Sequence, residues 1–141
     1  MERLTNLVRG LRKRNHEQLE KMAEDYISKA YDVLKKYFEK EPLAANYYSV
    51  IGVEILDIDI DEGTVEIGAP RFVEKDEECL YSSLEMTTEH LGEVFKREKD
   101  MDPEYVNIFA GILNERGFKC FYVPALAHYN DVVALCPCMI F

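Results

Sequence analysis

The stretch VVALCPCMIF, residues 132–141, is apolar throughout. Such a run predicts a strand buried on both faces, so we expect these residues to lie in the core of a sheet. Pro137 has no N–H to donate to a neighbouring strand, which predicts a place at a sheet edge or a bulge. Cys136 and Cys138 are two positions apart, so their thiols are expected to project from the same face of the strand.

The composition is that of one globular domain. A chain of 141 residues can bury a core without disulfides or a structural metal. The net charge is −10, but residues 1–21 carry six basic and three acidic residues, which leaves −13 for the remainder. A remainder this acidic repels the phosphate groups of nucleic acid, which argues against a nucleic-acid partner for it. With no apolar run long enough to cross a bilayer and no signal-peptide pattern, we expect a soluble cytoplasmic protein with no transmembrane segment and with reduced cysteines.

The first forty residues predict two helices. In the first, residues 1–14, an apolar stripe lies opposite a basic face and is formed by Leu4, Leu7, Val8 and Leu11. Asn15 and Gln18 form a capping-box pattern that starts a second helix, at the beginning of an α+β core of residues 15–141. The basic segment 9–14, with Arg9, Arg12, Lys13 and Arg14, is expected to form a solvated face or a surface for anionic lipid, nucleic acid or another subunit's acidic body. Because the apolar stripe must be buried somewhere, we favour a homodimer formed through residues 1–14, the N-terminal arm.

Residues 51–69 predict a β-hairpin. The apolar phase slips within its first strand, which predicts a bulge near Ile55 and Leu56, and Asp61-Glu62-Gly63 predicts the turn. Its acidic residues are expected in or near water: Glu54, Asp57, Asp59 and Asp61. The carboxylates at 57, 59 and 61 form a solvated face or, alternatively, bind a hard divalent cation.

Two more helices and a second hairpin follow. Helices are expected at about residues 77–98 and at 102–116, where Asp102-Pro103 is a strong start and Gly117 a suitable end. Strands are expected at residues 118–123 and in the closing apolar run. Two hairpins most simply join as one antiparallel sheet covered by helices on one face, so the sequence predicts an α+β fold.

The closing hairpin carries the residues best suited to a metal site. Cys120, Cys136 and Cys138, with His128 from the loop, could approach tetrahedral zinc geometry if the strand register brings them together. The alternative is that these cysteines are small buried hydrophobic residues. A redox or nucleophilic thiol is a further alternative, but it needs a lowered pKa and some exposure, and an apolar strand predicts the reverse.

The chain is rich in aromatic residues, with nine tyrosines and seven phenylalanines. Such residues form core, interfaces or ligand pockets. For a pocket between the sheet and its covering helices, the candidate ligand-binding residues are Tyr105, Phe109, Cys120 and Tyr122.

The order of elements resembles a known family. Its parts are the hairpin from Gly52 through Gly63 to Ile67, the helical run Ala110-Gly111-Ile112-Leu113, and a closing hairpin with cysteines before its apolar end. Over roughly residues 15–141 this pattern resembles the 4-vinyl reductase domain family, which is related to subunits of the TRAPP vesicle-tethering complex. The resemblance implies a small-molecule-binding α+β domain. The first hairpin is also similar to that of hotdog thioesterases, which continue into three further strands.

These observations favour a non-catalytic module that binds a small apolar ligand as a homodimer, with no cofactor or with zinc. The sequence contains no nucleophile–base constellation and no phosphate-binding loop. The first alternative is an enzyme with a thiol- or metal-dependent, or thioesterase-like, site at the closing hairpin. The second is an adaptor that docks a partner on its basic N-terminal helix.

Overall fold

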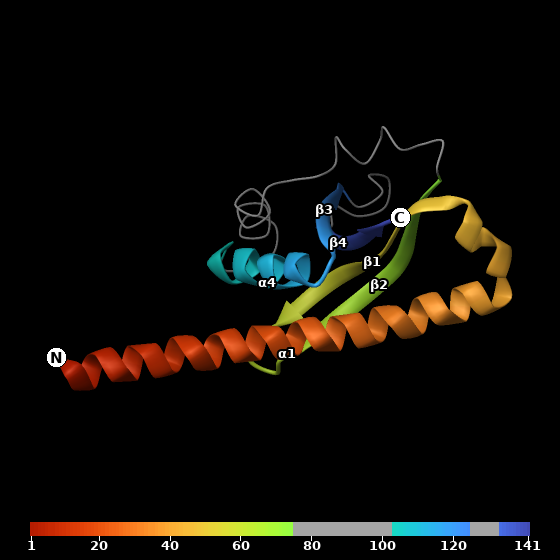
Figure 1. The fold of residues 1–141 in the computed structure, drawn as a ribbon. Coiled ribbons are helices and arrows are strands. Elements are labelled where there is room, and N and C mark those ends of the chain that lie inside the picture. Colours follow the sequence, from red (N-terminus) through yellow and green to blue (C-terminus); the bar gives the residue numbers. More distant parts are fainter. Residues whose placement is uncertain (75–102, 125–132) are drawn as a thin grey trace.

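The structure, a computed structural model, describes residues 1–74, 103–124 and 133–141. The elements in chain order are α1 (Glu2–Lys40), the 3₁₀ turn η1 (Pro42–Asn46), β1 (Tyr48–Asp59), β2 (Thr64–Glu74), α4 (Pro103–Glu115), β3 (Lys119–Pro124) and β4 (Val133–Ile140). The helix predicted at 77–98 lies outside the described residues. The four strands form one antiparallel sheet in the order β2-β1-β4-β3, so the two hairpins join through β1 and β4. The predicted α+β class is confirmed (Figure 1).

The long helix α1 runs without a break through Asn15, so the prediction of two helices is wrong. Asn15 is only mildly unfavourable inside a helix, and the chain has no proline before Pro42 to stop the helix. The imidazole of the next residue, His16, lies 2.9 Å from the carboxylate of Glu20, an i,i+4 pair that supports continuation of the helix. The Gln18 amide, expected in a capping box, instead donates to the Ile60 carbonyl oxygen at 3.3 Å.

α1 and α4 share one hydrophobic core with the sheet. The helices contribute side chains at three- and four-residue spacing, and the strands contribute alternate residues, as these two periodicities require. The buried members of this core are Leu19, Met22, Ala23, Tyr26, Ala30, Val53, Ile55, Ile58, Val65, Phe109, Ala110, Ile112 and Leu113. The core therefore lies between the sheet and the described helices, as the sequence predicted, and α1 runs along the sheet (Figure 1).

The first hairpin follows the sequence prediction except at Glu54. The β1–β2 register shifts on both sides of Ile55, which confirms the predicted bulge. Gly63 closes the turn with φ of +69°, a conformation that favours glycine. Glu54 was expected near water, but it is 6% exposed. Its carboxylate pairs with the Arg71 guanidinium, and this partner is what permits the burial of the charge.

The closing strand β4 differs from its prediction in two ways. It is an inner strand between β1 and β3, so the expected edge position of Pro137 is wrong. Its register with both neighbours is regular on either side of Pro137, so there is no bulge either. Cys136 and Cys138 are buried as expected, but Met139 is 39% and Phe141 69% exposed, so the strand end is not core. These two side chains line a cavity that is open to the surface, which explains their exposure.

Candidate functional site

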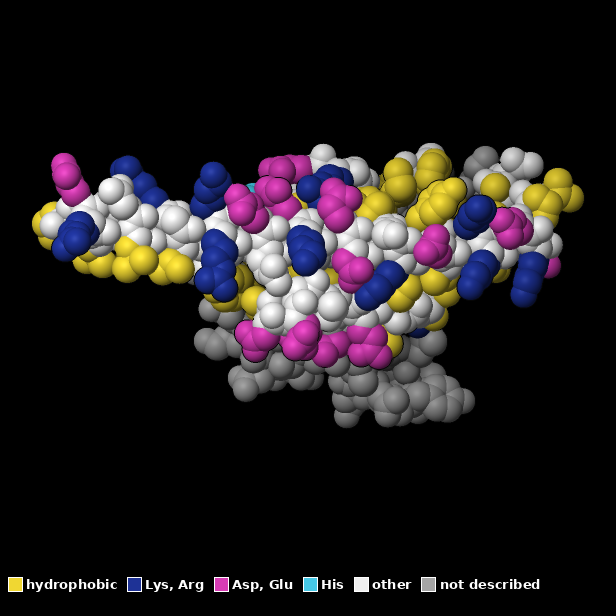
Figure 2. All heavy atoms as spheres, turned by 90° about the horizontal axis from the view of Figure 1, so that it is seen from below, with side chains coloured by type: hydrophobic (Ala, Val, Ile, Leu, Met, Phe, Trp, Pro, Cys, Tyr) yellow, Lys and Arg dark blue, Asp and Glu magenta, His cyan; other side chains and the backbone are white. Residues whose placement is uncertain are grey.

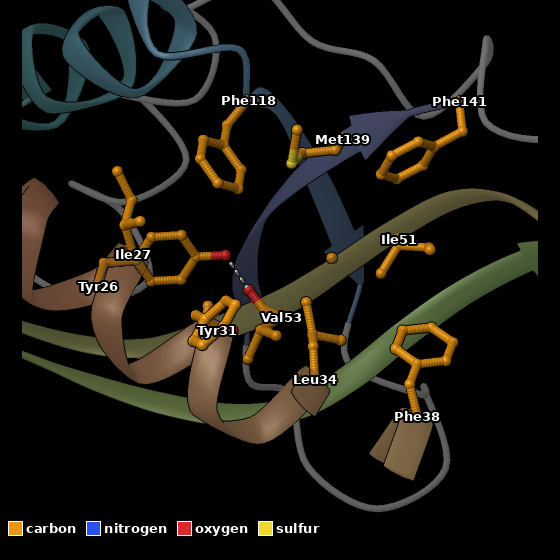
Figure 3. A pocket seen from close by; sticks show the side chains of 12 residues that line it. Tyr26, Ile27, Tyr31, Leu34, Phe38, Ile51, Val53, Phe118, Met139 and Phe141 are labelled. Atoms are coloured by element: carbon orange, nitrogen blue, oxygen red, sulfur yellow. Dashed lines mark hydrogen bonds between the residues drawn. The ribbon is translucent and has the colours of Figure 1, made fainter. Parts of the chain in front are cut away.

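A cavity of about 270 Å³ lies between α1 and the sheet (Figure 3). One wall is a single face of the helix, and the other comes from β1, the end of β4 and the residue before β3. The lining residues are Tyr26, Ile27, Ala30, Tyr31, Leu34, Phe38, Ile51, Gly52, Val53, Phe118, Met139 and Phe141. The lining is almost wholly apolar and contains no charged side chain.

Residue size explains why the space is open. Large side chains approach from both walls: Leu34 and Phe38 from the helix, Ile51 and Met139 from the sheet (Figure 3). Between them the helix presents Ala30, which is 3% exposed and has only a methyl group to fill the gap. The walls are kept apart by larger neighbours, so the small residue leaves a hollow.

Tyr26 is a fully buried lining residue with a polar group, and its hydroxyl is already engaged. It donates to the Val53 carbonyl oxygen at 2.8 Å and lies 3.2 Å from the Pro137 carbonyl oxygen. Both carbonyls therefore face the gap between β1 and β4, and the register places residue 53 opposite residue 137. An amide at 137 would donate to Val53 there, but proline has none. The tyrosine hydroxyl takes its place, which explains how a proline is accommodated in an inner strand.

An aromatic cluster borders the cavity near the C-terminal end of α1. The Tyr48 and Phe72 rings are stacked with centroids 4.5 Å apart, and Tyr37 lies 4.6 Å from Phe72. Phe38, a lining residue, packs edge-on against Phe72 at 5.9 Å. The Tyr48 hydroxyl lies 3.2 Å from that of Tyr37, and this hydrogen bond is the main cause that raises the pKa of Tyr48. The cluster fixes the ring of Phe38 at the cavity wall.

The sequence-predicted ligand residues occupy other places. Phe109 is fully buried in the core, and Tyr105 is partly buried against the same core. Neither is among the residues that line the cavity. Cys120 and Tyr122 lie on β3, and their side chains are outside what the structure describes. The cavity residues that sequence reasoning missed come mainly from α1, where Tyr26 was a usable signal: a tyrosine on a buried helix face requires a hydrogen-bond partner.

The two cysteines of β4 lie on the other face of the sheet. Side chains alternate along a strand, and Met139 lines the cavity, so Cys136 and Cys138 project away from α1. Their sulfurs are 3.7 Å apart, as expected for thiols on one face. The hydrogen bond with Cys138 and burial raise the pKa of Cys136, which keeps it a thiol. Gly52 faces them, and a Cβ there would meet the Cys138 sulfur.

The described residues, 1–74, 103–124 and 133–141, support a metal site less than they support a cavity for an apolar ligand. No group of three or more His, Cys, Asp or Glu side chains gathers there in a way that could hold a metal ion. His128 falls outside these ranges, and the side chain of Cys120 is not described, so the predicted zinc set is represented by Cys136 and Cys138 alone. The exposed Asp59 accepts a hydrogen bond from the amide of Glu62 at 3.0 Å, a turn contact rather than a cation site.

No protein-family model, no curated protein and no solved structure matches this chain. Among the helices that the structure describes, none has the length and apolar character needed to cross a membrane.

Proposed function

We propose that this protein binds a small, uncharged, apolar molecule in the cavity between α1 and the sheet, without catalysing a reaction. The observation that carries the proposal is the cavity itself, about 270 Å³ in volume and apolar in its lining. A well-packed interior leaves few voids of this size, and a hollow lined by large apolar side chains is typical of a ligand site. The resemblance to 4-vinyl reductase domains supports the same class of function.

The lining restricts the chemistry of the ligand. A carboxylate or ammonium group inside the cavity would lose its hydration without gaining a charged partner, which is strongly unfavourable. The Tyr26 hydroxyl is committed to the β1–β4 gap, so it does not select for a polar ligand. The lining residue Tyr31 is 63% exposed, so it lies at the mouth of the cavity. Any polar group of the ligand therefore stays at the mouth, and an apolar body enters.

Three further statements belong to the same proposal. We place the protein in a reducing cytoplasm, because Cys136 and Cys138 are free thiols although their sulfurs are adjacent. We propose that it works without a resident cofactor. We also propose that it acts as a homo-oligomer, because the apolar stripe of the N-terminal arm is exposed in a single chain.

The test uses N-phenyl-1-naphthylamine, an uncharged probe whose fluorescence rises in apolar surroundings. The full chain should bind it saturably, with one probe for each chain, and should gain thermal stability with it. Ala30→Leu places a larger side chain in the hollow and should abolish the fluorescence rise while the protein stays folded. If that variant fails to fold, Ile51→Phe fills the hollow from the sheet side and should have the same effect.

The matched control is Ala45→Leu, the same change at an exposed alanine of η1. It should bind the probe as the parent does. Absence of saturable binding to the parent protein would reject the proposal. Equal binding by the parent and by a folded cavity-filling variant would reject this location of the site.

A further inference from the structure

The first turns of α1 form an arm that projects beyond the sheet (Figure 1). From residue 1 to residue 14 every side chain is exposed except the half-buried Val8. Three leucines on one side of the arm are 59%, 57% and 44% exposed: Leu4, Leu7 and Leu11. Figure 2 shows these apolar side chains as a continuous band along one edge of the arm.

Such a band is a poor surface to leave in water. A helix of this length is marginal in isolation, and most helices in proteins are held by burial of an apolar face. The arm also contains Gly10, which weakens a helix further and has nothing within 4 Å of where a Cβ would lie. Contact with another surface would therefore both bury the leucines and hold the helix.

The charges around the arm are complementary to the body of the same molecule. The arm carries five basic residues and one acidic residue, Glu2. The tip of the β1–β2 hairpin lies at the root of the arm, where Gln18 donates to the Ile60 carbonyl. The residues around that tip are acidic and exposed: Asp57, Asp59, Asp61, Glu62 and Glu66. Arg3 and the N-terminal amine at the tip of the arm lie far from this hairpin along their own straight helix, but they can reach the acidic hairpin of a second copy.

We propose that two copies of this chain pair through their arms, antiparallel, about a two-fold axis between Leu7 and Val8. The stripe is symmetric about that point, so Leu4 of one copy lies opposite Leu11 of the other, as a two-fold interface requires. In this register the tip of each arm comes within about two turns of the partner's residue 18, where the acidic hairpin begins. The attraction between the tip and the partner's hairpin opposes the repulsion between the basic residues of the two arms.

This pairing rests on the homo-oligomer proposed above and not on the ligand. The shape also favours a second copy over a flat membrane. In Figure 2 the body extends past the edge of the arm that carries the apolar band, and a row of acidic side chains lies on that same side. A flat anionic bilayer that touched the band would meet these carboxylates, whereas a second helix is narrow enough to lie along the band beside the body.

The experiment is sedimentation velocity on the full chain over a range of concentrations. The 16.4 kDa chain should sediment as a dimer, and Leu7→Ser should raise the dissociation constant about tenfold or more. The matched control, Leu43→Ser, changes a leucine that is 69% exposed in η1 and should leave the dimer intact. Circular dichroism and probe binding should show that both variants keep the folded body.

A second pair of variants tests the electrostatic part. Reversing the hairpin charge with Asp61→Lys and Glu62→Lys should weaken the dimer, because Arg3 and the N-terminal amine at the tip then meet basic side chains. A parent protein that stays monomeric, or a dimer that survives Leu7→Ser, would overturn the proposal. So would a monomer that binds vesicles of anionic phospholipid through Leu7, which would identify the arm as a lipid anchor. Probe binding is read separately, so loss of the dimer and loss of the ligand site are distinguishable.

Discussion

Replacing Tyr26 with phenylalanine tests how the closing strand is held in the sheet. The ring of Tyr26 is fully buried, and its hydroxyl donates to the Val53 carbonyl at 2.8 Å. Phenylalanine keeps the ring and its packing against Phe118, whose centroid lies 6.0 Å away. Only the hydroxyl is lost, so the variant isolates one hydrogen-bonding group.

The expected loss of unfolding free energy follows from the Val53 carbonyl oxygen, which remains without its donor. Removing one partner of a buried hydrogen bond leaves the other unsatisfied, which costs about 1–3 kcal/mol. Because Pro137 has no N–H, no ladder bond can replace the lost donor at the Val53 carbonyl. The cavity beside Tyr26 could admit a water molecule, but its walls are apolar, so we expect a value near the middle of the range, about 2 kcal/mol.

Urea denaturation followed by circular dichroism measures this loss, and a second substitution tests its cause. Pro137→Ala restores an amide that can donate to the Val53 carbonyl. Tyr26→Phe should therefore cost at least about 1 kcal/mol less in the alanine background than in the parent. Equal costs in the two backgrounds would mean that the hydroxyl does not replace the missing amide, and the reasoning would be refuted.

Two further predictions concern the opposite face of the sheet. Gly52→Ala should destabilise the protein by about 1–3 kcal/mol or more, because its Cβ would meet the Cys138 sulfur and lie 2.6 Å from the Pro137 carbonyl oxygen. Removing the sulfur with Cys138→Ala should not restore stability, because the carbonyl remains. Full recovery in urea denaturation would contradict this. The raised pKa of Cys136 makes the free energy of unfolding depend on pH. Below the ordinary thiol pKa of about 8.5 the thiol is protonated in both the folded and the unfolded chain, so no stability is lost. Above that pH the unfolded chain loses the proton first, so stability falls as pH rises. Unfolding curves should therefore show a steeper loss above that pH for the parent than for Cys136→Ala, and an identical pH dependence would count against the burial of this thiol.

Local signals in the sequence were sufficient for most elements. The phase slip at Ile55 marked the bulge, the turn at Gly63 closed the hairpin, and proline at the start and Gly117 at the end marked α4. In each case the cause lies within a few residues of the effect, as with any turn, cap or amphipathic period. The union of two distant hairpins in one sheet could also be predicted, because free strand edges must be paired or covered.

The features that the sequence analysis predicted wrongly or missed depend on contacts between residues far apart in the chain. Pro137 is tolerated inside the sheet because a hydroxyl from α1 reaches it across 111 positions of sequence. Glu54 is buried because Arg71 on the neighbouring strand neutralises it. The cavity likewise depends on the distance between the helix wall and the sheet wall. In the sequence alone, Ala30 is indistinguishable from any other small core residue. None of these is visible in a periodic pattern.

The arm follows from a mismatch of lengths, and the hydrogen bond of Tyr26 separates it from the cavity. A helix of 39 residues is about 58 Å long, while the longest strand, with 12 residues, spans about 40 Å. The helix must therefore extend past the sheet by more than three turns, and the hydrogen bond from Tyr26 to β1 fixes at which end it does so. That bond also holds the cavity wall against the sheet, more than two turns of helix beyond the arm. The two proposals thus concern separate lengths of one helix, and a change in the arm should leave the affinity of the cavity for its ligand unaltered.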